Sequence, residues 1–354
     1  MGTSSRPTAP ELEVGLLAGF AFACRPDCGL CCYAEPRIDA AERARLVQIA
    51  PEATFLGVSP NVFLPARGDG GACRFLVNHA CRVHGARPHP CREFPVAVHV
   101  GVRLQATVVL SCPGIDLAPL ARFRAGAPAK PPTGLASELA AVRSRIDAGT
   151  SRRLAESGRR RRRIARVLER AGRWVEEEEV RRRLRRAIPW PEVGDFPVED
   201  PPATVDGLAS LPLFFAGRDG PVGLGSGIGG WQLIELDPDG IAAQPLGTWA
   251  PPVRPPALTD DGRTLLGGYL AYWLERDALF GAVAIAMADS DEGDVTEWTA
   301  AELRAIGALT LARAAVRAKA RTGLDAPLAA REVADGIRAV DQDLLDRDSW
   351  GDRL

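Results

Sequence analysis

Several features are scarce in this sequence of 354 residues. No apolar run reaches the roughly 18 residues of a membrane span, so the sequence predicts no membrane-spanning helix. The formal net charge of −1 gives no overall electrostatic indication of a nucleic-acid or membrane partner. Lysine occurs only at Lys130 and Lys319, which we interpret as genomic bias because arginine replaces it almost throughout. Hydrophobic residues make up 46% of the chain, as in a globular protein that buries a core.

A basic leader is also lacking. The apolar segment "VGLLAGFAFAC" at 14–24 ends in small residues and a cysteine, as a secretory or lipoprotein signal does, but Glu11 and Glu13 precede it and only Arg6 is basic. We therefore expect a cytoplasmic protein, and disulfide bonds would be expected only if the chain were exported. In a reducing compartment, clustered cysteines are more often metal ligands or catalytic groups than disulfide partners.

The residue types divide the chain into parts. All eight cysteines lie between Cys24 and Cys112, whereas all seven tryptophans lie between Trp174 and Trp350. The segment "AGAPAKPPTGLA" at 125–136 has the composition of a linker. We predict an α+β protein in which a small cysteine-rich metal-binding domain precedes a mainly helical domain containing a β-hairpin. The predicted parts are a cysteine-cluster domain at 15–123, a linker and arginine-rich helix at 124–190, and a C-terminal α+β domain of unknown role at 191–354.

Two elements are predicted within the cysteine-rich part. Asp39 followed by Glu42 is a capping-box pattern, and it predicts a helix that stops at Pro51. Between 96 and 110, the even positions are apolar and most odd positions are polar, which predicts a half-buried strand or a hairpin broken at Gly101. This strand would deliver Cys112, the last of the thiols.

The segment 151–190 contains fifteen arginines and six glutamates. Glu177, Glu178 and Glu179 each precede an arginine by four residues, the favourable order for ion pairs on a helix. One interpretation is an exposed charged helix that braces two domains. The alternative is that "GRRRRR" at 158–163, or the wider segment 158–186, binds RNA or an acidic protein partner.

The C-terminal part mixes strands and helices. An Asp-Pro-Asp-Gly turn predicts a hairpin at 231–246, and "GSGIGG" at 225–230 predicts a flexible glycine loop rather than a dinucleotide fingerprint, because a strand follows it. Thr299 and Glu302 are the expected cap of a helix that runs to about Arg321. A final helix is predicted from a repeating apolar face, formed by Val333, Ile337, Val340 and Leu344.

Four of the cysteines fall within nine residues, "CRPDCGLCC". Loops of two to four residues between ligands let a chain wrap around a tetrahedral ion or one face of a cluster. The adjacent Cys31 and Cys32 point in different directions, so they suit two different ions or two different roles. The sequence permits two four-thiolate sites, or one cluster and one mononuclear site. The candidate metal ligands are Cys24, Cys28, Cys31, Cys32, Cys73, Cys81, Cys91 and Cys112.

Charged and polar residues near Cys91 are further candidates. Arg87 and Arg92 flank Cys91 and are candidate cofactor-binding residues, because they could hydrogen-bond a negatively charged thiolate centre; surface salt bridges are the alternative. His84 or His89 could replace a thiol as a ligand, although a solvated or structural role is the more common one for a histidine.

The motifs resemble a known family. "FACRPDCGLCC" at 22–32, "GACRFLVNHACRVHGARPHPCREFP" at 71–95 and "SCPG" at 111–114 are similar to the YkgJ-type cysteine-cluster family, the zinc- or iron-chelating domain named for its CxxCxxCC motif. The resemblance covers about residues 20–116, and it places Cys112 at a position common in longer members. The chain departs from the family pattern at one point, because three residues rather than two separate Cys24 from Cys28.

Three functions follow from these patterns. The first is a metal-binding protein whose centre is structural or redox-active, with an iron–sulfur cluster or iron favoured and zinc as the alternative, because soft thiolates suit both metals. The second is a protein-modifying enzyme, since a flagellin lysine methylase carries a similar cysteine cluster; no methyl-donor site is recognisable in this sequence. The third is an RNA- or partner-binding module built on the arginine-rich helix.

Overall fold

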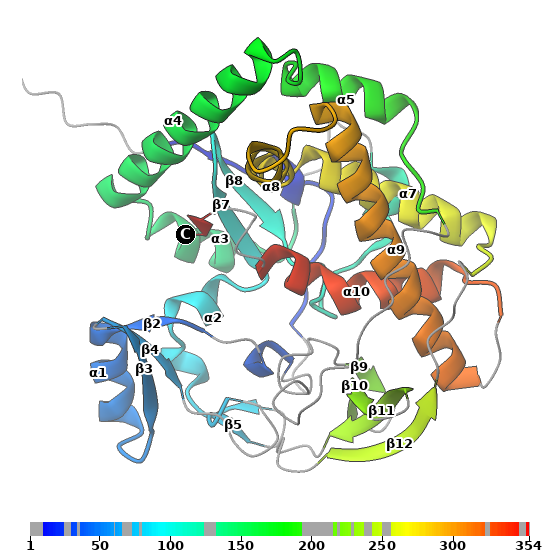
Figure 1. Ribbon diagram of the computed structural model, residues 1–354. Helices are drawn as coiled ribbons and strands as arrows, with labels where there is room; N and C mark the ends of the chain where they lie inside the picture. The colour runs from blue at the N-terminus through cyan, green and yellow to red at the C-terminus, as the bar shows by residue number, and fades with distance from the viewer. Residues whose placement is uncertain are drawn as a thin grey trace, which may run out of the picture.

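A computed structural model describes most of the chain (Figure 1). It does not describe residues 1–9, 25–29, 34–35, 60, 66–72, 78–79, 124–131, 193–214, 218–219, 228–229, 237–242, 250–255, 323–325, 347–351 and 354. Cys28 and His79, most of the predicted linker and the predicted Asp-Pro-Asp-Gly turn therefore lie outside the described residues. No helix within the described ranges is long and apolar enough to cross a lipid bilayer.

The chain folds as an α+β protein, as predicted. Its α-helices are α1 (Ala40–Ile49), α2 (His89–Glu93), α3 (Ala136–Arg143), α4 (Ala148–Arg170), α5 (Glu177–Arg186), α7 (Asp260–Glu275), α8 (Asp277–Ala288), α9 (Val295–Thr322) and α10 (Ala330–Asp346). Short 3-10 helices are η1 (Gly15–Leu17), η2 (Leu30–Tyr33), η3 (His84–Ala86) and η4 (Ala118–Arg122).

The strands form four small sheets. They are β1 (Leu12–Glu13), β2 (Ile38–Asp39), β3 (Phe55–Ser59), β4 (Val62–Pro65), β5 (Leu76–Val77), β6 (Ala80–Cys81), β7 (Val96–Val100), β8 (Leu104–Val108), β9 (Phe215–Gly217), β10 (Gly220–Gly227), β11 (Gly230–Leu236), β12 (Ala243–Trp249) and β13 (Asp352–Arg353). The sheet orders are β1-β8-β7-β13, β12-β11-β10-β9, β2-β4-β3 and β5-β6.

The antiparallel hairpin β7–β8 lies at the centre of the larger core. The alternating pattern correctly predicts a hairpin, but the expectation that one face is exposed is wrong, because every residue of both strands is buried. His99 is only 1% exposed. The side-chain amide of Gln105 donates to the Glu275 carbonyl at 3.1 Å and accepts from the Asp277 amide at 2.8 Å. The backbone of two distant helices therefore satisfies Gln105, which lies on the face that the sequence predicts to be solvated.

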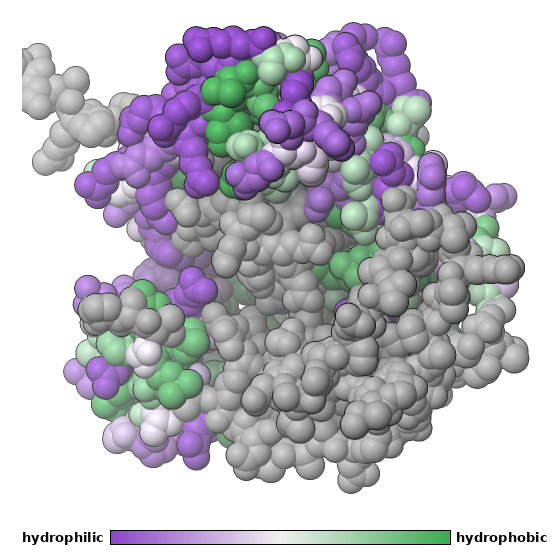
Figure 2. Space-filling model, in the orientation of Figure 1, coloured by the Kyte–Doolittle hydropathy of each residue, from purple (hydrophilic) through white to green (hydrophobic). Residues whose placement is uncertain are grey.

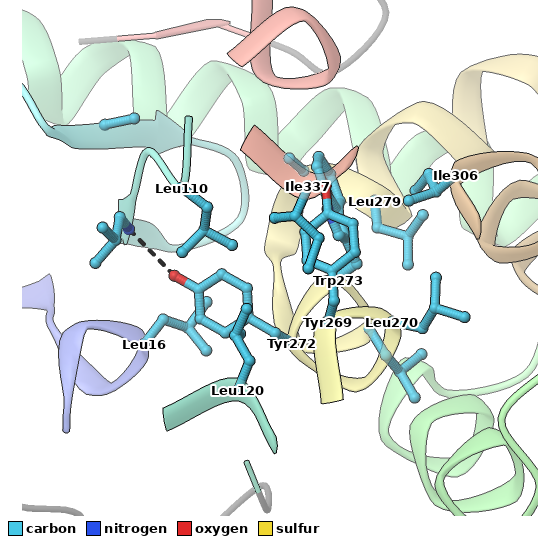
Figure 3. Packing of buried hydrophobic residues seen from close by; sticks show 14 of the residues in the cluster. Leu16, Leu110, Leu120, Tyr269, Leu270, Tyr272, Trp273, Leu279, Ile306 and Ile337 are labelled. Atoms are coloured by element: carbon cyan, nitrogen blue, oxygen red, sulfur yellow. Dashed lines mark hydrogen bonds between the residues drawn. The ribbon is translucent and has the colours of Figure 1, made fainter. Parts of the chain in front are cut away.

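Aromatic and aliphatic side chains from many elements pack on this hairpin (Figure 3). Tyr269, Tyr272 and Trp273 of α7 are fully buried, and the Tyr272 hydroxyl accepts from the Val108 amide at 3.1 Å. Phe20 meets Tyr272 edge to face, with ring centroids 5.5 Å apart. The segment before the cysteines and the helices near the end of the chain thus share one core.

A buried ion pair connects α10 to the same hairpin. The Asp341 carboxylate accepts from Arg276 at 2.9 Å, from the Tyr269 hydroxyl at 3.1 Å and from the Leu110 amide at 2.7 Å. The side chains of Asp341 and Arg276 are both completely buried. The Arg276 guanidinium also donates to the Val108 carbonyl at 3.2 Å, and these additional hydrogen bonds offset part of the cost of burying the two charges.

The predicted cysteine-cluster domain contributes to two different cores. Its hairpin belongs to the larger core, whereas Ile38, Leu46, Phe75 and Val83 form a smaller one beneath α1 and the β2-β4-β3 sheet. The predicted limits at 123 and 190 stay a prediction, because sharing a core does not tell whether a part folds alone. Figure 1 shows α1 and this sheet together at the lower left.

The helix α1 begins and ends as predicted. The Asp39 side chain accepts from the Glu42 amide at 2.8 Å and caps the helix, which ends just before Pro51. The predicted cap of α9 is wrong, however. Asp294 and Glu297 form a reciprocal capping box, with both bonds at 2.9 Å, so the helix begins at Val295. Thr299 instead donates to a carbonyl inside the helix.

The C-terminal strands form an antiparallel sheet. β11 pairs with β12, which confirms the hairpin predicted around residues 231–246. The prediction of a glycine loop at 225–230 is wrong for the residues that the structure describes, since Gly225, Ser226 and Gly227 belong to β10 and pair with β11. No helix follows β10 directly, so the segment lacks the context of a dinucleotide site.

The predicted ion pairs on the arginine-rich segment are confirmed in part. Glu177 pairs with Arg181 at 3.6 Å and Glu179 with Arg183 at 2.7 Å, each four residues apart on α5. Residues 151–186 form two helices, α4 and α5, separated by a turn. One arginine of the run, Arg161, turns inward and is only 6% exposed.

Candidate metal centre

The cysteine doublet lies on the 3-10 helix η2, next to a second cysteine-bearing segment. Cys31 and Cys32 are both partly buried. The amide of Cys73 donates to the Cys32 carbonyl at 2.8 Å, so the backbone itself joins the first and second cysteine groups. About forty residues of sequence separate them, and this hydrogen bond closes the loop.

A tight hairpin places Cys73 and Cys81 near one another. The Leu76 amide donates to the Cys73 carbonyl at 2.8 Å, and Leu76 is paired with Cys81 across β5 and β6. Both cysteines pack against the smaller core, on which Phe75 is buried. The core therefore orients the hairpin and the two thiols that it carries.

Cys91 lies in the short helix α2, and two side chains of α1 hold the segment before it. Glu42 accepts from the His89 amide at 2.6 Å, and Arg45 donates to the Arg87 carbonyl at 3.2 Å. The Glu42 side chain does not return to its own helix, as a capping box would require. It instead binds the first amide of α2, and this contact fixes the direction in which Cys91 enters.

The far end of α2 is fixed as well. Glu93 is buried and pairs with Arg145, which follows α3, at 2.7 Å. On the same helix, Arg92 donates to Nδ1 of His89 at 3.0 Å. A guanidinium has no acceptor, so Nδ1 must accept, and a neutral His89 carries its proton on Nε2. Neither ring nitrogen then offers a lone pair to a metal, which argues against His89 as a ligand.

Six of the described thiols affect one another's ionisation. They belong to Cys24, Cys31, Cys32, Cys73, Cys81 and Cys91. Burial raises the pKa of Cys24, Cys81 and Cys91, and the charge of Cys31 raises each of them further. The positive charge of Arg87 opposes this increase in all three. Thiols that influence one another's ionisation in this way lie within the range of direct Coulomb interaction.

Cys31 and Cys32 differ in ionisation although they are adjacent. A hydrogen bond from the Cys32 thiol lowers the pKa of Cys31 to about 7, against the effect of burial, and the charge of Arg87 lowers it further. The same hydrogen bond raises the pKa of Cys32, which burial and the charges of Cys31, Cys73 and Cys81 also raise. The doublet thus loses its first proton easily and retains the second, so its two members are not equivalent.

Cys24 and Cys112 come from segments that run side by side. The Ala23 amide donates to the Gly114 carbonyl at 2.9 Å, and Phe22 forms a bridge with Ile115. A side chain at position 114 would overlap the Ala23 carbonyl, so this close approach requires glycine. Cys112 is buried in the larger core, whereas Cys24 is exposed.

Arg87 and Arg92, the two arginines predicted to bind a cofactor, each have a buried donor atom. The Nε atom of Arg87 is buried and has no hydrogen-bond partner among the residues that the structure describes, and the same is true of Nε of Arg92. An unsatisfied buried donor of a cation is costly, and an anionic group would satisfy it. Arg87 is the better placed of the two, because its charge acts on Cys24, Cys31, Cys81 and Cys91.

The thiols are gathered but do not yet form a closed ligand set. Within the described part of the chain, no three His, Cys, Asp or Glu side chains are arranged to hold a metal ion. Cys28, a predicted ligand, lies outside that part. His84 is exposed, and His99 is buried in the central hairpin.

The sequence does not predict that Glu42 and Arg45 position the segment that carries Cys91. Glu42 is predicted only as a helix cap and Arg45 is not singled out, because their partners lie more than forty residues away. A polar side chain at the edge of an apolar helix face is a weak signal for such a contact. Only the packing of α1 against the cysteine segment reveals it.

One comparison with known proteins matches the cysteine-containing part of the chain. Residues 23–112 match the family model "CxxCxxCC: Putative zinc- or iron-chelating domain". The matched range begins one residue before Cys24 and ends at Cys112, so it includes all eight cysteines. Neither the curated proteins nor the solved structures contain a match to this chain.

Proposed function

We propose that the cysteine cluster holds a thiolate-ligated metal centre, with iron or an iron–sulfur cluster favoured over zinc. The observation that carries the proposal is the shared electrostatic neighbourhood of six thiols around Cys31 and Arg87. Its proposed ligands are drawn from Cys24, Cys28, Cys31, Cys32, Cys73, Cys81, Cys91 and Cys112. In a reducing compartment, the cytoplasm expected from the sequence, these thiols would stay available to the metal.

The chemistry of the donor set fits such a centre. Thiolate is a soft ligand that selects zinc, copper(I) and iron–sulfur clusters over hard cations. Burial raises the pKa of Cys91, and the negative charges of Cys31, Cys73 and Cys81 raise it further, so thiolates gathered here without a counter-charge are unfavourable. A bound cation removes this cost, because it replaces the thiol protons and stabilises the thiolates.

The number of thiols favours more than a single zinc site. A structural zinc ion takes four ligands, whereas six described cysteines already share this neighbourhood. Cluster iron is also held by thiolates, and its potential depends on hydrogen bonds and charges around the sulfurs. Arg87, with a buried donor atom beside several thiols, is suited to donate to such an anionic centre.

The protein's own residues position the centre. Glu42 and Arg45 hold the segment that carries Arg87 and leads to Cys91. Bound metal would supply electron transfer if iron and a fixed tetrahedral junction if zinc. Because the thiols that the structure describes are not a closed set, we expect binding to draw them together. Metal affinity is then coupled to folding by about 10 kcal/mol or more, on the scale of zinc-finger peptides.

The test is anaerobic purification of the full chain, followed by metal analysis and visible absorption. We expect stoichiometric iron, acid-labile sulfide and a brown colour that fades in air. Cys31→Ser and Cys91→Ser should each reduce the metal content strongly. Arg82→Ala serves as the matched control, because its exposed side chain lies in the same segment and pairs with Glu52, and it should retain the metal.

Each alternative result has a definite meaning. Colourless protein with stoichiometric zinc would keep the thiolate centre and refute the preference for iron. Protein that binds neither metal at submicromolar concentration, or that loses no metal when Cys31 and Cys91 are replaced, would contradict the proposal as a whole.

A further inference from the structure

Helix α4 exposes a straight stripe of arginines that the metal centre does not use. The arginine stripe consists of Arg152, Arg159, Arg163, Arg166 and Arg170, all of which are exposed. At 3.6 residues per turn, spacings of seven, four, three and four place them on one face of the helix. Figure 2 shows hydrophilic surface along the upper left margin, where Figure 1 places α4.

The neighbouring helix α5 shows that the stripe is unusual within its own chain. The exposed Arg182 and Arg183 of α5 both pair with Glu179. The five arginines of the stripe, by contrast, make no ion pair with any carboxylate in the described ranges. Only Glu156 and Glu169 are acidic on α4. Like charges three or four residues apart on a helix repel one another. The arginines of the stripe therefore repel one another on α4, whereas on α5 the carboxylate of Glu179 offsets this repulsion.

The opposite face of α4 fixes the helix in place. Arg161 turns inward and pairs with Asp277 at 3.0 Å and with Glu177 at 2.7 Å. Leu168 is buried on the same side, and a capping box of Asp147 and Thr150 starts the helix. The stripe therefore lies on a rigid rod, and its first and last arginines are about 27 Å apart along the helix axis.

We infer that the arginine stripe binds the phosphate backbone of double-stranded DNA without reading its sequence. Guanidinium groups form paired hydrogen bonds with phosphate, and the major groove of B-form DNA, about 12 Å wide, admits an α-helix.

The composition of α4 also disfavours other nucleic acids. Single-stranded DNA or RNA is bound through aromatic side chains that stack on bases, and α4 has none. The major groove of duplex RNA is deep and too narrow for side chains to read. A duplex with an open major groove therefore fits this surface better than either.

The experiment titrates the full chain against a labelled DNA duplex of mixed sequence at several salt concentrations. Engagement of five arginines predicts a slope of about −4.5 for log K against log [salt], at about −0.9 per phosphate contact. Arg159→Gln, Arg163→Gln and Arg166→Gln together should reduce the slope to about −1.8. The same three positions changed to lysine should keep it steep.

The matched control removes three other exposed positive charges. Arg82, Arg182 and Arg183 are ion-paired, with Glu52 or with Glu179, so their replacement by glutamine should leave the slope near that of the unmodified chain. An equal loss in this control would overturn the inference, because it would show only an effect of total charge. Tighter binding to duplex RNA or to poly-glutamate than to duplex DNA would overturn it as well.

Discussion

Replacing Glu42 by alanine tests how the protein positions Cys91. The carboxylate is only 9% exposed, and it accepts from the His89 amide at 2.6 Å, at the first residue of α2. Without it, the amide is left buried near the thiols and α2 loses its contact with α1. The orientation of α2, and with it the position of the Cys91 thiol, should then vary.

The expected loss of stability follows from the type of hydrogen bond that the replacement removes. A hydrogen bond to a charged group contributes about 1.5–3 kcal/mol, so Glu42→Ala should reduce the free energy of unfolding by about that amount. Residues that orient metal ligands typically change metal affinity by about 10–100-fold. Glu42→Gln keeps an acceptor for the same amide, and its effect should be smaller in both measurements.

The assay combines urea unfolding with anaerobic competition between the protein and a chelator. Glu52→Ala is the matched control, because Glu52 is exposed and its ion pair with Arg82, at 3.0 Å, should contribute about 0–1 kcal/mol. If Glu42→Ala had no greater effect than this control on metal affinity, the positioning role of Glu42 would be refuted.

Three further replacements probe other parts of the account. Asp341→Ala leaves the guanidinium of Arg276 buried without its partner, and urea unfolding should show a loss of about 3–5 kcal/mol. Gly101→Ala would push a methyl group into the Asp277 carboxylate, and thermal unfolding should report a destabilisation of about 1–3 kcal/mol. Arg87→Gln should weaken metal binding in the chelator competition and Arg87→Lys should restore part of it, whereas equal affinities would argue against an electrostatic role.

Local patterns predict several elements of the fold correctly. The Asp39 cap, the turn at Gly101 and the apolar face of Val333, Ile337 and Val340 all depend on neighbours along the chain. Such signals are strong because a helix or hairpin must satisfy its own backbone wherever it lies. The cysteine spacing likewise predicts which residues are the candidate ligands, and the range that the family model matches, residues 23–112, includes all of them.

Local sequence patterns do not predict contacts between distant segments. Gln105 is polar and is expected to face water, yet it bonds to backbone groups of α7 and α8. Arg161 is one of five consecutive arginines, and only the position of Asp277 decides that it is the buried one. The role of Glu42 depends on a partner in another helix. Each of these outcomes depends on tertiary packing, which overrides the local preference.

X-ray absorption at the metal edge of the anaerobically purified chain tests the central claim most directly. A thiolate-ligated centre should show a first shell dominated by sulfur at about 2.3 Å. A first shell of nitrogen or oxygen at about 2.0–2.2 Å, with little or no sulfur, would contradict a centre built from these cysteines.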